Sequence, residues 1–186
     1  MRIIAGRHRG RALVAPKGHS TRPTADRTRQ ALFNVLEHAP WAPDFAGARV
    51  LDLFAGSGAL GLEALSRGAA SCVFVDNDAA ALAALRDNIT ALRLEDQTEV
   101  RRADATRPLS ASAPVDIAFL DPPYAKGAVV PALAHLASGT VLASDAIIVV
   151  ERGVDEAPLT APGFALVDSR SWGAARVWFL KRSEGV

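Results

Sequence analysis

Four consecutive residues near the middle of the 186-residue chain are suited to chemistry on an amine. They follow an apolar run at 115–120 (VDIAFL) and read Asp121, Pro122, Pro123 and Tyr124. The Asp121 carboxylate and the Pro122 backbone carbonyl could accept the N–H bonds of an amine and so release its lone pair. Proline fixes φ near −65°, which would hold that carbonyl rigidly. Tyr124 could stack on a base drawn out of a nucleic acid. We predict a catalytic loop; the alternative is a rigid loop after a buried strand.

A glycine-rich turn earlier in the chain predicts a nucleotide-type cofactor site. In residues 50–65 (VLDLFAGSGALGLEAL) an apolar strand pattern runs into the turn, and a helical pattern follows. Positions without side chains let backbone N–H groups approach a ligand closely. The letters from Gly56 to Gly61 also match G-x-G-x-x-G, so a hydride-transfer enzyme stays an alternative. Such an enzyme has no need for Asp-Pro-Pro-Tyr.

Acidic residues at strand ends extend this predicted site. Asp76 closes a strand about 20 residues after the glycines, where a carboxylate can accept both ribose hydroxyls of an adenosine. Asp104 follows the next strand and could accept from an adenine amino group. Asp52 lies inside the first strand, where a buried acid needs a partner such as a ligand ammonium. The predicted cofactor-binding residues are Asp52, Phe54, Ala55, Gly56, Ser57, Gly58, Asp76, Asn77, Asp104 and Ala105.

The elements that must position these residues alternate between apolar runs and helical patterns from residue 49 onward, which is typical of βαβ units. Strands are predicted at 49–54, 71–76, 98–102, 115–120, 146–151, 164–170 and 174–181, and helices at 59–67, 79–93 and 128–137. A further helix with Leu32 and Leu36 on one face should precede the sheet, capped by Thr24. We therefore predict an α/β fold. Its seven-stranded, mainly parallel sheet should carry helices on both faces and a C-terminal antiparallel hairpin.

Three longer stretches carry a resemblance to a known family. "DLFAGSG" with a later "DPPY" is similar to S-adenosylmethionine-dependent enzymes that methylate exocyclic nitrogens of nucleobases. "RIIAGRHRGRAL", "RPTADRTRQALFNVL" and "LDLFAGSGALGLEALSRGA" resemble the bacterial RsmD-type 16S rRNA (guanine-N2)-methyltransferases over essentially the whole chain. Gln30 departs from the family pattern, which has glutamate there.

That resemblance implies a Rossmann-like methyltransferase fold with S-adenosylmethionine as methyl donor. It also implies that the substrate is guanine 966 of 16S ribosomal RNA within the assembled small subunit. Two alternatives remain. A DNA adenine-N6 or cytosine-N4 methyltransferase shares the motif but usually carries a separate target-recognition domain, for which the chain has little room. A nucleic-acid-binding module with a vestigial cofactor site would not need the intact Asp121 and both glycines.

Charge divides the chain into a basic start and an acidic remainder. Residues 1–30 hold eight Arg or Lys against the single acid Asp26, although the whole chain carries a net charge of only +1. This asymmetry predicts a basic arm that meets a polyanion; the alternative is a solvated tail. We expect a basic extension at 1–20, folded as a short hairpin, and a methyltransferase domain at 21–186. The predicted RNA-binding residues are Arg7, Arg9, Arg11, Arg22 and Lys126.

Other classes of protein fit the composition poorly. The only cysteine, Cys72, lies in an apolar run, which indicates a core residue in a reduced, cytoplasmic protein. No apolar run approaches the roughly 18 residues that span a bilayer. The arginine-rich start could suit a mitochondrial transit peptide, but its glycines and proline would break the required helix. The four histidines lack metal-ligand spacing, so we predict no metal. We expect a monomer.

Overall fold

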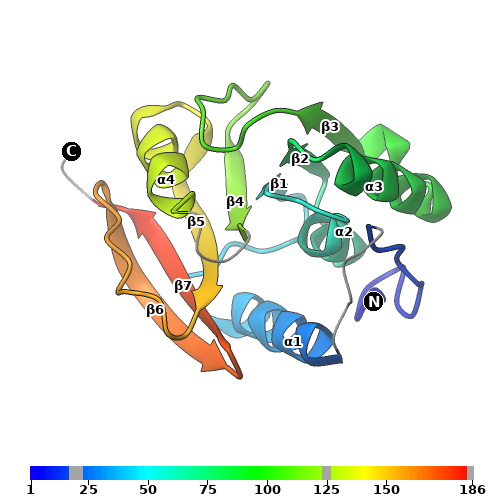
Figure 1. Ribbon diagram of the computed structural model, residues 1–186, viewed down its shortest axis with the longest axis horizontal. Coiled ribbons are helices and arrows are strands. Elements are labelled where there is room, and N and C mark those ends of the chain that lie inside the picture. Colours follow the sequence, from blue (N-terminus) through cyan, green and yellow to red (C-terminus); the bar gives the residue numbers. More distant parts are fainter. Residues whose placement is uncertain (17–22, 123–126, 184–186) are drawn as a thin grey trace.

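The computed structural model describes residues 1–16, 23–122 and 127–183, with residues 23–25 described by their backbone alone. In these ranges seven strands form one sheet in the order β3-β2-β1-β4-β5-β7-β6 (Figure 1). The strands are β1 (Arg49–Leu53), β2 (Ser71–Asp76), β3 (Thr98–Arg102), β4 (Val115–Leu120), β5 (Leu142–Gly153), β6 (Phe164–Trp172) and β7 (Ala175–Arg182). The first five are mutually parallel, and β7 runs antiparallel to both β5 and β6.

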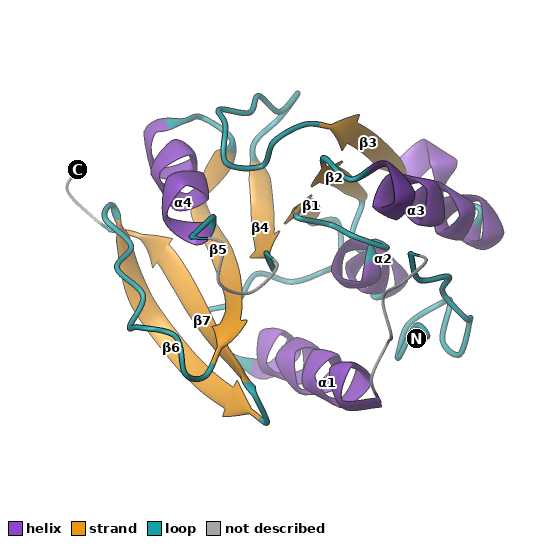
Figure 2. Cartoon of the chain, in the orientation of Figure 1, coloured by secondary structure: helices purple, strands orange, loops and turns teal. Residues whose placement is uncertain are grey.

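Helices cover both faces of this sheet (Figure 2). The helices are α1 (Pro23–His38), α2 (Ala59–Ser66), α3 (Ala79–Leu92) and α4 (Val129–Ser138), with a short 3-10 turn η1 (Glu95–Gln97). Val50 belongs to the core under α1, α2 and α3, whereas its neighbour Leu51 belongs to the core under α4. Alternate residues of a strand point to opposite faces, so an apolar run such as VLDL can line two cores. The predicted fold class is confirmed.

The strand order reverses direction between β1 and β4. From β1 the chain proceeds outward to β2 and β3 with α2 and α3 on one face, and then returns to β4, after which α4 lies on the other face. Because parallel crossovers are right-handed, reversing the order moves the helices to the opposite face of the sheet. Open α/β sheets bind ligands at such a switch point, beyond the carboxyl ends of the central strands.

Two local predictions were wrong. β5 begins at Leu142, four residues before the predicted start, because the exposed Ser144 and Asp145 interrupt the apolar pattern without interrupting the strand. Helix α1 begins at Pro23, so Thr24 lies within its first turn and is not the capping residue before it. Proline suits that position because its missing N–H has no partner in a first turn. No described helix is long and apolar enough to cross a membrane.

Residues 1–16, here called the arm, fold back on themselves before α1. The Ile3 N–H donates to the Arg11 carbonyl at 2.9 Å, and the Leu13 N–H donates to the Met1 carbonyl at 3.0 Å. Ile3 and Leu13 are buried against the core that contains α1 and α2. The arm is therefore a small hairpin-like loop (Figure 1), and its buried residues Ile3 and Leu13 pack against the body of the protein.

Helix α2 holds the arm by its backbone. The Glu63 carboxylate, fully buried at 0% exposure, accepts the N–H groups of Ile4 at 2.7 Å and Ala5 at 3.0 Å. Ser66 Oγ donates to the Ala5 carbonyl at 2.6 Å. A Cβ added at Gly6 would lie 1.8 Å from the Ser66 carbonyl oxygen, so only glycine permits this approach. The arm is thus docked on α2 through main-chain groups.

Candidate active site

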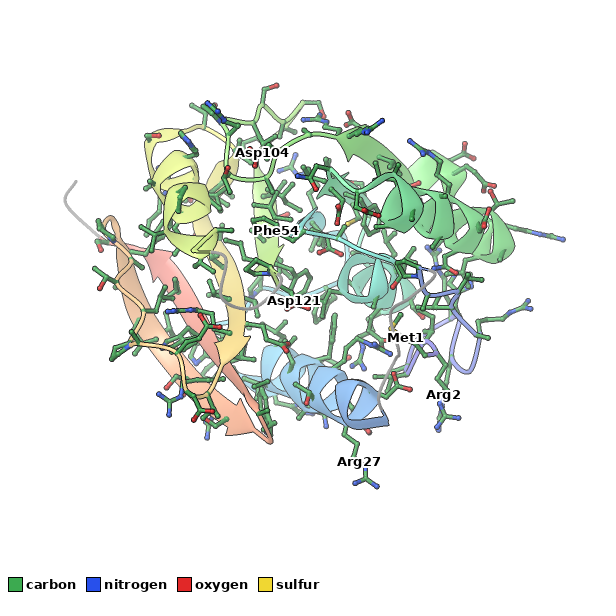
Figure 3. All side chains as sticks on the ribbon, viewed as in Figure 1. Met1, Arg2, Arg27, Phe54, Asp104 and Asp121 are labelled. Carbon is green, nitrogen blue, oxygen red and sulfur yellow. The ribbon has the colours of Figure 1, made fainter. Side chains whose placement is uncertain are left out.

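The parallel register brings the predicted site residues to one edge of the sheet. Leu53 pairs with Val75 on one side and with Leu120 on the other. The residues that follow these strands, Phe54 and Asp121 among them, therefore lie at neighbouring strand ends. Figure 3 labels Asp104, Phe54 and Asp121 one below another through the middle of the view. The glycine loop and the Asp121–Pro122 pair consequently lie on either side of the switch point between β1 and β4.

The glycine loop after β1 has an unusual backbone. Phe54 adopts φ +62°, in the left-handed region of backbone conformation. A non-glycine residue held there costs on the order of 1–3 kcal/mol, and such strained residues occur most often at functional sites. Gly56 has φ +56°, and a Cβ added there would meet no atom within 4 Å. Gly58 has φ +82°, but its Cβ would lie 2.4 Å from the Leu85 side chain. Gly56 therefore leaves backbone open to a ligand, whereas Gly58 is required for packing against α3.

Two acids at the ends of β2 and β3 have hydrogen-bonding capacity left for a ligand. Asp76 Oδ2 accepts the Gly56 N–H at 2.8 Å, and its Oδ1 accepts the Asp78 N–H at 2.8 Å. A carboxylate has about four lone-pair sites, so ribose hydroxyls can still bind. Asp104 is exposed, and hydrogen bonds from Thr106 lower its pKa, so it is ionised at neutral pH. These groups fit the adenosine part of S-adenosylmethionine.

Asp52 has a structural partner that the sequence did not reveal. It is 2% exposed, and its Oδ2 accepts the Gly61 N–H in the first turn of α2 at 2.9 Å. Burial raises the pKa of Asp52 to about 8; the Gly61 bond opposes this, and the charge of Asp76 adds to it. Helix N-terminal N–H groups need acceptors, so Asp52 meets a need of α2 without any ligand.

Asp121 stands beside a second carboxylate. The residue is exposed to solvent as a whole, yet protein atoms surround its carboxyl group, and this desolvation raises the pKa of Asp121 well above its ordinary value. The charges of Glu151 and Asp52 raise the pKa further. Because Leu120 pairs with Val150, Asp121 directly after β4 and Glu151 within β5 occupy adjacent positions on neighbouring parallel strands. A carboxyl group with a raised pKa can take up a proton near neutral pH.

The remaining predicted residues fall into three groups. Pro122, Ala55, Ser57 and Ala105 are buried, so they can act only through their backbone or by packing, and Asn77 is exposed. Four predicted residues lie outside the described residues: Pro123, Tyr124, Lys126 and Arg22.

The arm's arginines have different surroundings. Arg7, Arg9 and Arg11 are all exposed, and the Arg7 guanidinium also donates a hydrogen bond to Gln97. Arg29 in α1 is 5% exposed and pairs with Asp26 at 2.9 Å, so it does not contribute to a free basic surface. Arg2 and Arg27 point away from the body of the protein in Figure 3. The arm's exposed arginines therefore keep their charge at the surface, whereas Arg29 is paired with Asp26.

Three residues with a place at or behind the site were missed from the sequence. Glu151 could have been noticed, because it ends an apolar run in the same way that Asp121 does. Glu63 and Asn88 lie within helical patterns. Glu63 accepts the N–H of Ala5, which is 58 residues away in the sequence, and Asn88 accepts the N–H of Val14, which is 74 residues away. No local signal identifies such contacts.

A sheet of this order, with a glycine loop after β1 and Asp121–Pro122 after β4, defines a Rossmann-like methyltransferase fold. The model of the family described as "Conserved hypothetical protein 95" matches residues 1–181. The chain belongs to this family, which is the RsmD type of methyltransferase.

Its relatives cover nearly the whole chain. Ribosomal RNA small subunit methyltransferase D of Escherichia coli (strain K12) is 39% identical over 162 residues, which span 87% of this chain and 79% of that protein. YlbH of Bacillus subtilis is 38% identical over 98% of this chain and 99% of its own length. The solved structure of yhhF from Escherichia coli superposes with a TM-score of 0.84 at 33% identity, covering 100% of this chain and 99% of the other.

Proposed function

We propose that the protein uses S-adenosylmethionine to methylate the exocyclic N2 of a guanine in 16S ribosomal RNA. The observation that carries this proposal is the position of Asp121 and Pro122 directly across the switch point from the glycine loop. The relatives named ribosomal RNA small subunit methyltransferase D support an rRNA substrate. The family resemblance favours guanine 966 in the assembled small subunit.

Four groups of this chain suit the methyl donor. The open backbone at Gly56 and the carboxylates of Asp76 and Asp104 are proposed to hold its adenosine, and Phe54 borders the same loop. When bound, S-adenosylmethionine supplies a methyl group already activated on a sulfonium. The contribution of the protein is then mainly placement and charge stabilisation.

Asp121 and Pro122 are proposed to activate the amine. The lone pair of the guanine N2 is delocalised into the ring, so the amine is a poor nucleophile. One N–H would donate to the Asp121 carboxylate and the other to the Pro122 backbone carbonyl, which returns electron density to nitrogen. As the N–C bond forms and the S–C bond breaks, one N–H proton must leave. Asp121, whose pKa burial raises, is a suitable acceptor for it.

RNA capture is proposed for the arm. Arg9 and Arg11 are exposed on a hairpin that α2 holds in place, and Arg7, Arg22 and Lys126 are proposed to join them at the phosphates. Lys and Arg contacts to phosphate supply affinity that depends on salt and not on base sequence. The choice of nucleotide would then be made at the Asp121 loop.

Mapping the methylated nucleotides of ribosomal RNA in a strain that lacks the gene for this protein tests the proposal. One N2-methylguanine that the 16S rRNA of the parent strain contains should be absent. Expression of the parent should restore it, and expression of Asp121→Ala should not. An unchanged rRNA methylation pattern would contradict the proposal. Loss of methylated adenine or cytosine from DNA instead would assign the protein to the DNA amino-methyltransferases.

A further inference from the structure

One buried side chain joins the arm to the glycine loop. Asn88 of α3 is 1% exposed. Its Nδ2 donates to the backbone carbonyls of Val14 and Ser57, each at 3.0 Å, and its Oδ1 accepts the Val14 N–H at 2.7 Å. The arm therefore receives two hydrogen bonds from this amide and the glycine loop receives one.

The chemistry of this position requires an amide. Neighbouring inward positions of α3, such as Leu85 and Ile89, are apolar, and an apolar side chain at 88 would serve packing equally well. An apolar side chain at position 88 would, however, leave the backbone groups of Val14 and Ser57 without a hydrogen-bond partner, and each buried polar group without a partner costs about 1–3 kcal/mol. Aspartate could accept from Val14 but has no N–H to donate. Asparagine is the small side chain that satisfies both segments together.

The bond to Ser57 fixes a peptide unit at the centre of the glycine loop. The Ser57 carbonyl shares a rigid peptide plane with the Gly58 N–H, and this N–H donates to the Ala55 carbonyl at 2.7 Å. Asn88 thus holds one side of the plane while the loop holds the other. Gly56, whose backbone is open to a ligand, lies directly before this plane. A shift of Asn88 would therefore be transmitted to the surface that meets the ligand.

We propose that Asn88 is a positioning residue that couples RNA capture by the arm to binding of the methyl donor by the glycine loop. Contact of RNA with the arm would hold Val14 and hence Asn88 more firmly in place, and Asn88 in turn would hold the Ser57 carbonyl in its binding orientation. Coupling between two binding sites is reciprocal, so each ligand raises the affinity of the other by the same factor. This inference rests on the proposed function.

Equilibrium dialysis with S-adenosylhomocysteine, the unreactive product of the donor, tests the coupling. Its affinity is measured for the full-length protein alone and with saturating small-subunit particles from the deletion strain. The ratio of the two affinities should be at least about fivefold in the parent, the lower end of typical coupling. In Asn88→Asp, which loses both donors, the ratio should fall to within twofold of one.

Two further variants separate coupling from damage to the fold. Val14→Pro removes the N–H that Asn88 accepts, at a position whose side chain is 54% exposed, and should also bring the ratio close to one. Ser66→Ala loosens the arm at its other attachment without touching the glycine loop, so it should weaken particle binding and keep the parent's ratio.

A parent ratio of one, with both ligands bound, would overturn the coupling and leave the proposed function intact. The coupling would also be overturned if Val14→Pro and Asn88→Asp both kept the parent's ratio of S-adenosylhomocysteine affinities with and without particles. A parent that binds neither S-adenosylhomocysteine nor the particle would remove the proposed function, and this inference with it.

Discussion

Replacing Asp52 by asparagine should change how the stability of the protein depends on pH. Asparagine keeps an oxygen acceptor for the Gly61 N–H but cannot ionise. In the parent, burial raises the pKa of Asp52 from 3.8 to about 8, so the folded state holds the proton more tightly than the unfolded state. The unfolding free energy of the parent therefore falls as pH rises from the unfolded pKa of 3.8 to the folded pKa of about 8, and above about pH 8 the stabilisation by the bound proton is lost. The variant lacks this contribution.

The size of the effect follows from the two pKa values. Each pKa unit corresponds to about 1.36 kcal/mol, so the interval between 3.8 and about 8 gives an upper limit on the order of 5 kcal/mol. Relaxation of the protein around a buried charge reduces such values, and we expect about 2–5 kcal/mol. Because small domains have unfolding free energies of roughly 5–15 kcal/mol, this contribution should be readily measurable.

Urea unfolding of the free protein at intervals from pH 4 to pH 9 provides the assay. The difference in unfolding free energy between Asp52→Asn and the parent should grow with pH and level off above about pH 8. Asp145→Asn, a change at an exposed acid of β5, should retain the parent's dependence. Parallel curves for the parent and Asp52→Asn would refute the assignment of a buried, proton-binding Asp52.

The remaining predictions concern Asp121, the glycine loop and the arm. Because desolvation, Glu151 and Asp52 raise the pKa of Asp121, kcat/KM of the parent should rise with pH through that raised value. Asp121→Ala should bind donor normally but lose at least about a hundredfold in single-turnover rate; a parental rate would exclude the acceptor role. Gly56→Val should weaken S-adenosylmethionine binding in calorimetry. Gly58→Val should instead unfold more easily, by about 1–3 kcal/mol, because it collides with Leu85; equal effects of the two variants on stability would contradict this division. Arg9→Ala/Arg11→Ala should keep the parent's affinity for the methyl donor but bind RNA more weakly. The slope of log K for RNA binding against log salt concentration should become shallower by up to about 0.7–0.9 per lost phosphate contact. An unchanged slope would show that these arginines are ordinary solvated charges.

The alternation of apolar runs was sufficient to predict most of the fold. Strands at 71–76, 98–102 and 115–120 have the predicted bounds, because their apolar residues are bounded by polar residues or turns. β5 was predicted too short because two exposed polar residues precede its apolar centre. The N-terminal end of α1 could not be placed from Thr24, because the adjacent Pro23 is equally suited to a first turn.

The sequence predicted which segments meet at the site but not the task of each residue. Parallel strands bring their carboxyl ends to one edge, so the positions of Phe54 and Asp121 followed from the order of elements. The packing role of Gly58 depends on Leu85 of another helix, and the partner of Asp52 depends on the start of α2. Such roles are set by contacts between elements, which the pattern of one element does not contain.

The attachment of the arm has a consequence for how freely its sequence can change. Glu63 and Ser66 recognise main-chain groups that every residue except proline possesses, so most exposed side chains of the arm can be exchanged without loss of docking. Gly6 is the exception, because any side chain there would collide with α2. The outward surface of this hairpin could therefore be redesigned, and its proposed contact with RNA altered, while the sheet stays untouched.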